Sequence, residues 1–306
     1  MPRACIVGGG AMGCGVSAVF LGGGWDVDVV SPSASTRATL EERVRAAISR
    51  MPGRSFDPAR LRAHAGMAQV PWSEVAFVVE NAPEDLALKQ GVFRELERLA
   101  PPGIPLASNA SSLPISRIGE GLGTQRRMLG LHFYMPAFLV PLVEVVCSEK
   151  TDPAVAAQAA DLMWALGKRP VQVARDIEGF LANRIQHALI REAVHLLDSG
   201  IASAEDIDAA VRYSFGFRLA VAGPLMQREH AGWDMSCSVA RALYPHLSNI
   251  DAPPKVVVDL VRQGRHGMKT GRGLYEWDKE SMAKERQRYE TSLQAVLAVI
   301  QQEGLR

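Results

Sequence analysis

The chain has 306 residues, of which 47% are hydrophobic and 22% are charged, and its formal net charge is +1 at pH 7. That length allows two domains, each large enough to bury its own core. The near-neutral charge and the absence of a strongly basic stretch argue against a broad cationic surface, so we expect no nucleic acid as a partner.

The cysteines and the uncharged N-terminal stretch indicate the cellular compartment of the protein and whether it spans a membrane. The four cysteines form no CxxC pair, so we expect no disulfide framework and no metal site. This pattern favours a cytoplasmic location. The cysteines are Cys5, Cys14, Cys147 and Cys237. The stretch from Ala4 to Trp25 is uncharged but rich in glycine, so strand, turn and helix explain it better than a spanning helix, and no membrane partner is expected.

The first half of the chain alternates short apolar runs with helical patterns. A buried strand is predicted over Ala4–Val7, a helix over Gly13–Leu21 and a second strand over Val27–Val30. Further helices are predicted over Leu40–Met51 and Leu86–Leu99, and further strands over Phe77–Val79, Ile104–Ala107, Met128–Phe133 and Leu142–Val146. Such alternation predicts an α/β fold with a doubly wound, mostly parallel sheet and helices on both faces.

From Phe180 onward the chain shows helical patterns and no convincing strand. Helices are predicted over Phe180–Ser199, Ser203–Val211, Pro254–Gln263 and Glu280–Gln302. Gly200 ends the first of them, and Ser203 is a suitable N-cap for the second. The change of pattern predicts an N-terminal domain over residues 1–178 and an all-helical C-terminal domain over residues 179–306.

A glycine-rich turn joins the first predicted strand to the first helix. It reads Gly8-Gly9-Gly10-Ala11-Met12-Gly13 and has the G-x-G-x-x-G pattern. In such a turn Gly8 permits the tight bend, Gly10 lets the backbone approach a pyrophosphate, and Gly13 allows close packing of helix on strand. The strand–turn–helix context distinguishes it from an ordinary glycine-rich turn. It predicts a dinucleotide-binding Rossmann domain in which Gly8, Gly10, Met12 and Gly13 contact the cofactor.

The second strand ends at Ser31, where this fold usually has an acidic residue for the ribose 2′-OH. Asp28 lies too early in the strand for that role. Without the acid a 2′-phosphate is not repelled, and Ser31, Ser33 and Arg37 are able to contact one. The same residues also suit a capped loop that leads into the next helix. NAD and NADP therefore both remain open on these residues alone.

Four later segments follow the glycine loop in an order that resembles the 3-hydroxyacyl-CoA dehydrogenase family. They are Ser108-Asn109-Ala110-Ser111-Ser112-Leu113-Pro114, Gly130-Leu131-His132-Phe133-Tyr134-Met135-Pro136, Pro141-Leu142-Val143-Glu144-Val145-Val146 and Gly179-Phe180-Leu181-Ala182-Asn183-Arg184. The resemblance covers nearly the whole chain. It implies hydride transfer at C3 of an L-3-hydroxy acid or its thioester, NAD as the cofactor, and a helical domain that binds substrate and forms a homodimer.

The resemblance also implies roles for single residues. His132 matches the general base that removes the hydroxyl proton, and Glu144 matches the carboxylate that orients its ring. An imidazole titrates near neutral pH, and a carboxylate partner favours its charged form and fixes its tautomer. Ser111 matches the hydroxyl that hydrogen-bonds the reacting oxygen, and Asn183 matches the amide that helps to hold substrate and base.

Three further positions match contacts to the cofactor in the family. Glu84 and Lys89 match residues at the cofactor ribose, and Asn109 matches a residue near the nicotinamide end. The chain departs from the family at Met135, where an asparagine is common, and at Ala110, where a threonine is usual.

Within the family, two segments look closer to lambda-crystallin, L-gulonate 3-dehydrogenase and carnitine dehydrogenase. They are Asn183–Gln186 and Phe215–Leu225. The second contains Arg218, where the acyl-CoA enzymes usually lack an arginine. A guanidinium there is able to bind a free substrate carboxylate through two parallel hydrogen bonds, and a surface arginine explains it equally well.

Two other functions stay open at this point. The first is action on the CoA thioester, because a group of arginines lies in the region that meets CoA in the acyl-CoA enzymes, although a solvated helix face explains the same charges. These are Arg45, Arg50, Arg54, Arg60 and Arg62. The second is a non-catalytic, crystallin-like protein that binds the dinucleotide without turnover. The predicted base and its partner argue against it, because binding alone requires neither.

Overall fold

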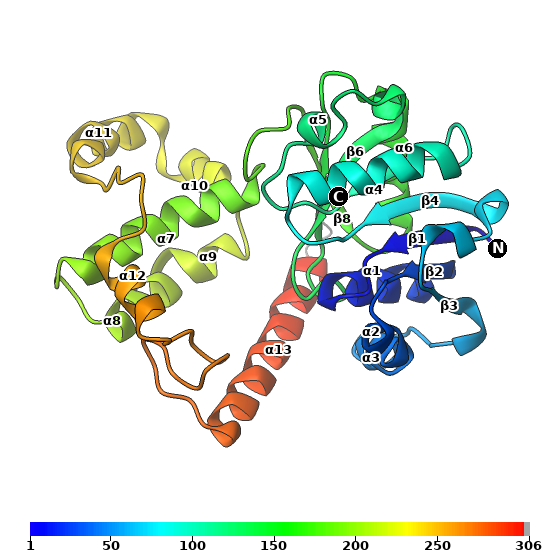
Figure 1. The fold of residues 1–306 in the computed structure, drawn as a ribbon. Coiled ribbons are helices and arrows are strands. Elements are labelled where there is room, and N and C mark those ends of the chain that lie inside the picture. The colour runs from blue at the N-terminus through cyan, green and yellow to red at the C-terminus, as the bar shows by residue number, and fades with distance from the viewer. Residues whose placement is uncertain (303–306) are drawn as a thin grey trace. The chain divides into compact units, whose positions relative to one another are not determined.

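The computed structural model describes residues 1–302 and falls into two compact units, Met1–Arg184 and the chain from Ile185 onward (Figure 1). The first unit contains the strands β1 (Arg3–Val7), β2 (Asp26–Val30), β3 (Leu61–His64), β4 (Val75–Glu80), β5 (Leu106–Ser108), β6 (Met128–Phe133), β7 (Leu142–Val146) and β8 (Arg169–Val173). Its helices are α1 (Ala11–Gly22), α2 (Ala34–Ala38), α3 (Leu40–Ile48), α4 (Leu86–Leu99), α5 (Ile115–Ile118) and α6 (Pro153–Ala165).

The strands form one sheet in the order β3-β2-β1-β4-β5-β6-β7-β8. Neighbouring strands are parallel, except that β7 runs antiparallel to β6. The chain builds outward from β1 in both directions, first through β2 and β3 and then through β4. The carboxyl ends of β1 and β4 therefore flank the switch point at which doubly wound folds bind their ligands.

Helices cover both faces of the sheet, and the inner strands are largely apolar for that reason. Ala4 and Ile6 of β1 join one core with side chains of α1, α3 and α6. Cys5 and Val7 point the opposite way and join a second core with α4 and α5, as the alternation of side chains along a strand requires. The predicted α/β fold with a doubly wound, mostly parallel sheet is confirmed.

The rest of the chain is helical. Its elements are α7 (Ala182–Asp198), α8 (Ala204–Val211), a π-helix (Arg212–Gly216), α9 (Phe217–Leu219), α10 (Pro224–Ala231), α11 (Trp233–Leu243), α12 (Lys255–Arg262) and α13 (Lys279–Gln302). The Ser203 hydroxyl accepts a hydrogen bond from the Asp206 N–H at 3.0 Å and caps α8, as predicted. Up to Gln302 this part contains only two isolated β-bridges, which confirms its helical class.

Few side chains of the helical part are shielded from solvent within one chain. Of residues 185–301, only Gly273 is buried. Large apolar side chains stand in solvent on several helices, among them Leu225 at 70% exposure and Trp233 at 52%. Residues 185–301 of a single chain therefore lack the buried apolar core that normally stabilises a helical domain. No helix within residues 1–302 is long and apolar enough to cross a membrane.

Most predicted boundaries agree with the structure, and two strands were not predicted. Helix α4 and strands β6 and β7 have the predicted bounds. Helix α3 ends at Ile48 instead of Met51, and β5 begins at Leu106 instead of Ile104. The unpredicted strands β3 and β8 are the two edges of the sheet. Because edge strands are partly exposed, these two lack the continuous apolar run that marks the inner strands.

The glycine loop between β1 and α1 is closely packed at two glycines and open at the third. Gly8 has a φ of +111°, and a Cβ there would lie 2.6 Å from the Asn81 carbonyl oxygen. A Cβ on Gly13 would lie 1.7 Å from the Gly8 carbonyl oxygen. A Cβ on Gly10 would meet no atom within 4 Å, so this glycine leaves room for a ligand to approach the backbone. The loop thus suits a pyrophosphate at the start of α1.

This contrast predicts opposite effects for two alanine substitutions. Gly13→Ala should lower the free energy of unfolding by about 1–3 kcal/mol, because the new methyl group collides with backbone. Gly10→Ala should change stability by less than about 1 kcal/mol, since the site is open. It should nevertheless weaken dinucleotide binding about tenfold or more, because the methyl group occupies the approach to the phosphates.

Denaturant unfolding and calorimetric titration with NAD would measure the two effects, and each variant is the control for the other. Normal NAD binding by Gly10→Ala, or normal stability of Gly13→Ala, would contradict this account of the loop.

Candidate active site

A histidine and a glutamate meet at the single antiparallel pairing of the sheet. His132 of β6 lies directly opposite Glu144 of β7 in the strand register, and its Nδ1 is 2.8 Å from the Glu144 Oε2. The two side chains are 4% and 0% exposed. Because a carboxylate accepts hydrogen bonds, this contact places a proton on Nδ1 and leaves Nε2 as the ring atom that is able to take a proton.

Glu144 accepts hydrogen bonds from three further donors besides His132. Its Oε1 accepts hydrogen bonds from the backbone N–H groups of Leu181 at 3.0 Å and Ala182 at 2.8 Å, at the start of α7. The Tyr134 hydroxyl donates to Oε2 at 3.0 Å. Burial raises the pKa of Glu144, but the hydrogen bonds from His132, Ala182 and Tyr134 and the charge of His132 outweigh it and hold the pKa below 4.5. The carboxylate is therefore charged at neutral pH.

A turn at residues 179–180 brings the start of α7 onto Glu144. Gly179 and Phe180 have positive φ angles of 73° and 48°, and Phe180 is buried despite that uncommon conformation. The ring centroid of His132 lies 5.5 Å from that of Phe180 and 4.5 Å from that of Tyr134. Two aromatic rings therefore fix the imidazole, and a backbone conformation of this kind is often found at functional sites.

Ser111 and Asn183 lie close together in the structure. The Asn183 side-chain amide donates to the backbone oxygen of Ser111 at 3.4 Å, while the Ser111 hydroxyl has no hydrogen-bond partner within residues 1–302. The Tyr134 hydroxyl meets the backbone N–H of Asn183, so Tyr134 links this pair to Glu144. The four residues predicted as catalytic thus fall into two contacting pairs, and no hydrogen bond joins Ser111 to His132.

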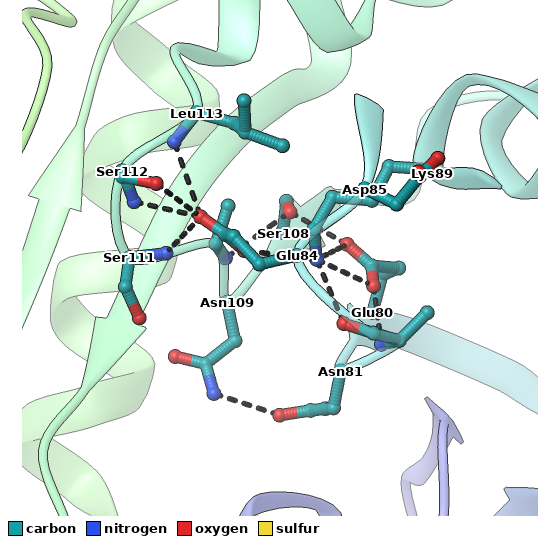
Figure 2. A network of polar contacts seen from close by, with 12 residues as sticks. Glu80, Asn81, Glu84, Asp85, Lys89, Ser108, Asn109, Ser111, Ser112 and Leu113 are labelled. Atoms are coloured by element: carbon teal, nitrogen blue, oxygen red, sulfur yellow. Dashed lines mark hydrogen bonds and ion pairs between the residues drawn. The ribbon is translucent and has the colours of Figure 1, made fainter. Parts of the chain in front are cut away.

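Glu84 anchors the loop that carries Ser111 (Figure 2). Its Oε1 accepts from the backbone N–H groups of Ser111 at 3.0 Å, Ser112 at 2.7 Å and Leu113 at 3.2 Å. Burial raises the pKa of Glu84, but the Ser112 hydrogen bonds, the charge of Lys89 and the Leu113 N–H outweigh it and lower the pKa, so the carboxylate stays charged. The position matched to a cofactor contact therefore also fixes a loop.

Lys89 and Asn109 are buried, and Figure 2 shows them in the same group of polar side chains as Glu80 and Asn81. The Lys89 Nζ is fully buried and donates to both oxygens of Glu80, at 2.9 and 3.0 Å. The Asn109 amide donates to the Asn81 side-chain oxygen and accepts from the Phe133 N–H, both at 2.8 Å. These contacts join the carboxyl ends of β4, β5 and β6, at the same end of the sheet as the glycine loop.

The structure places the other predicted residues as follows. Ser31 directly follows β2, with its side chain beside Gly9, and Met12 is half-buried in α1. Arg218 lies on α9 and lines a cavity of about 450 Å³ with apolar side chains and two further basic residues, Arg228 and His230. Within residues 1–302 no group of three His, Cys, Asp or Glu is placed to hold a metal ion.

Several site residues were not predicted from the sequence. Tyr134 follows His132 by two positions, and the alternation of side chains along a strand was a signal that could have identified it. Glu80, at the end of an apolar strand, was a similar signal. Phe180 and the backbone donors of residues 181 and 182 carry no signal in the sequence, because their role depends on how the chain turns.

Comparison with known proteins agrees with this geometry. Residues 3–177 match the family model described as 3-hydroxyacyl-CoA dehydrogenase, NAD binding domain, and residues 179–277 match the C-terminal domain of the same family. The chain is 34% identical over 277 residues to the 5-formyl-3-hydroxy-2-methylpyridine 4-carboxylate 5-dehydrogenase of Mesorhizobium japonicum, covering 88% of this chain and 89% of the relative.

Two further relatives extend the comparison. The L-carnitine dehydrogenase of Streptomyces coelicolor is 35% identical over 236 residues, covering 75% of this chain and 73% of that protein. A crystal structure of a 5-formyl-3-hydroxy-2-methylpyridine 4-carboxylic acid 5-dehydrogenase, described as an NAD⁺-dependent dismutase, superposes with a TM-score of 0.89 at 29% identity and covers 98% of this chain and 99% of its own. The chain therefore belongs to the 3-hydroxyacyl-CoA dehydrogenase family and has the NAD-binding domain of that family.

Proposed function

We propose that the protein is a nicotinamide-dependent dehydrogenase that transfers a hydride between C3 of an L-3-hydroxy acid and the cofactor, with a free carboxylate as the preferred substrate. The observation that carries the proposal is the buried contact between His132 and the charged Glu144. A protein that only binds a dinucleotide has no use for a base with a fixed partner, so a crystallin-like role is the weaker reading.

The chemistry divides between the cofactor and the chain. The nicotinamide ring supplies the hydride acceptor when it is bound. The Nε2 of His132 takes the hydroxyl proton of the substrate, and Glu144 stabilises the positive charge that the ring then carries. The Ser111 hydroxyl, which has no partner within residues 1–302, hydrogen-bonds the reacting oxygen. Asn183 holds the Ser111 loop beside it.

Two observations favour a free acid over a CoA thioester. The names of the two relatives, the pyridine 4-carboxylate dehydrogenase and carnitine dehydrogenase, denote substrates with a free carboxylate. In addition, three of the arginines considered for CoA already have partners, since Arg45 pairs with Glu41, Arg60 pairs with Asp26 and Arg54 donates to a backbone oxygen. Their charges are explained without CoA.

Arg218 is the residue that we propose to bind the substrate carboxylate. It follows a π-helix, an uncommon element that is frequent at functional sites. Gly216 makes that turn possible, because a Cβ there would lie 2.6 Å from the Val211 carbonyl oxygen. The Arg218 guanidinium has no carboxylate partner within residues 1–302, so its donors are available to a ligand.

We also propose that the helical part, taken as residues 179–306, binds substrate and forms a homodimer. Only Gly273 is buried among residues 185–301, and the exposed apolar side chains lie on several helices and not on one small patch. A second copy is the partner that always accompanies the chain and is large enough to cover them. All four cysteines are free thiols, which supports our proposal of a cytoplasmic location.

Replacing the base should abolish turnover without removing the cofactor. His132→Ala should lower kcat by about 10²- to 10⁴-fold, because general-base catalysis is lost, while dinucleotide affinity stays near the wild-type value. Absorbance of the reduced nicotinamide would measure the rate, and fluorescence titration would measure binding. The exposed His246 provides the matched control as His246→Ala. Wild-type turnover by His132→Ala would refute the proposed base.

The substrate class follows from a small matrix of assays. Wild-type protein would be assayed with NAD and NADP against 3-hydroxybutyryl-CoA, free 3-hydroxybutyrate, L-gulonate and L-carnitine. We expect turnover of a free acid, and Arg218→Met should raise the KM for that acid by about 10- to 100-fold through loss of a charged hydrogen-bond pair. Arg241→Met, at an exposed arginine of α11, is the control. Turnover of the thioester alone would exclude the carboxylate role of Arg218.

Dimer formation should make the stability of the protein depend on its concentration. We expect light scattering to report twice the mass of one chain and the unfolding temperature to rise with protein concentration. Leu225→Lys should weaken the association, because it places a charge on the apolar surface. Leu88→Lys, at an exposed leucine of α4, should not. A monomer whose unfolding temperature is independent of concentration would contradict the proposal.

A further inference from the structure

The end of β2 lies beside the glycine loop, where this fold holds the adenosine ribose of a dinucleotide. Ser31 occupies that position with its side chain turned toward the loop. A Cβ on Gly9 would lie 3.2 Å from the Ser31 Cβ and 3.0 Å from the Thr36 Cγ2, so both residues stand against the loop. The Ser31 hydroxyl has no hydrogen-bond partner within residues 1–302, although the residue is buried.

Between Asp28 and Glu41 the chain has no carboxylate that could bind the ribose 2′-OH. Asp28, the nearest acid along β2, is fully buried and is already paired. Its Oδ2 accepts from Arg3 at 2.9 Å, and its Oδ1 lies 2.6 Å from the His64 Nε2. The next acid along the chain, Glu41, forms an ion pair with Arg45 on α3. The residue pattern therefore lacks the group that usually selects NAD and repels a 2′-phosphate.

Two guanidinium groups instead contact the backbone of Ser31 and of the segments next to it, Gly9 and Thr36. The Arg37 Nη1 donates to the Ser31 backbone oxygen at 2.6 Å and to the Pro32 oxygen at 2.9 Å. The Arg43 Nη2 donates to the backbone oxygens of Gly9 and Thr36, both at 3.0 Å. These partners are neutral, and neither arginine has a carboxylate within ion-pair distance in residues 1–302.

The charges of Arg37 and Arg43 are thus uncompensated and fixed in place by backbone contacts. A guanidinium has five N–H donors, so each arginine keeps donors for a ligand after its contacts to carbonyl oxygens. A phosphate is the group that planar, fixed guanidinium donors and a free hydroxyl recognise best. A neutral ribose hydroxyl would leave both charges without a partner.

We propose that Ser31, Arg37 and Arg43 form a binding site for the 2′-phosphate of NADP(H), so that this protein binds NADP(H) more tightly than NAD(H). The inference rests on the proposed function only in that the dinucleotide lies along the glycine loop. It makes the end of β2 the part of the chain that determines cofactor choice.

Nucleotide fragments without a nicotinamide ring test the site independently of turnover. Calorimetry would compare 2′,5′-ADP with 5′-AMP on the full-length protein without substrate. We expect 2′,5′-ADP to bind about tenfold more tightly or better, with an affinity that falls as salt is raised. Equal affinities for the two fragments would overturn the proposal.

Substitutions then assign the difference to residues. Ser31→Asp and Arg37→Met should each remove most of the advantage of 2′,5′-ADP. Arg37→Met should leave 5′-AMP binding near its wild-type value, and Ser31→Asp should leave it equal or tighter, because a carboxylate accepts a hydrogen bond from the ribose 2′-OH. Arg45→Met removes the same charge from the exposed, ion-paired arginine of α3 and should leave the advantage intact. An unchanged advantage in both Ser31→Asp and Arg37→Met would overturn the proposal, and thermal unfolding would verify that each variant is folded.

The outcome is separable from that of the proposed function. Absence of turnover with every 3-hydroxy acid would refute the dehydrogenase assignment and leave the fragment result standing. Turnover with NAD together with equal binding of the two fragments would refute the phosphate site and leave the dehydrogenase assignment standing.

Discussion

The charged, buried carboxylate of Glu144 is the constraint on which the site depends. A carboxylate with no solvent contact is stable only when donors surround it, and here they come from three parts of the first unit: the imidazole of His132, the hydroxyl of Tyr134 and the backbone at the start of α7. Removing any one donor leaves part of a buried charge unsatisfied. The same contacts that keep Glu144 ionised therefore fix the tautomer of His132, the turn at Gly179 and Phe180, and the first turn of the helix.

A second buried charge organises the neighbouring strand ends in the same way. Lys89 is enclosed by Glu80 and the backbone, and Glu80 in turn accepts from the Ser108 hydroxyl at 2.6 Å. Glu84 continues this set of contacts to the loop of Ser111 (Figure 2). Polar groups thus join the carboxyl ends of β4 and β5 and the following loop, at the end of the sheet where the glycine loop lies. The free-energy cost of burying these groups is offset by their hydrogen bonds to one another. Those bonds hold the side chains at this end of the sheet in a single arrangement.

The sequence was sufficient for the inner part of the fold and for the central pair of the site. Inner strands such as β6 and β7 are largely apolar and were predicted with their bounds, whereas the edge strands β3 and β8 were missed because one side of each meets solvent. His132 and Glu144 were matched as partners through the family motifs, and the register of β6 and β7 brings them together. The anchoring role of Glu84 and the donors of residues 181 and 182 could not be predicted. They arise from distant segments that meet only in three dimensions.

The place of β1 in the sheet has a consequence for synthesis on the ribosome. β1 is made before β2 and β4, and it lies between them in the finished sheet. One edge is satisfied when β2 emerges, but the other remains open until Val75–Glu80 have been made. During that interval a strand that is apolar from Ala4 to Val7 presents unpaired backbone groups, which is the feature that promotes association between nascent chains. Until β4 has been made, this open edge of β1 is therefore able to pair with another nascent chain.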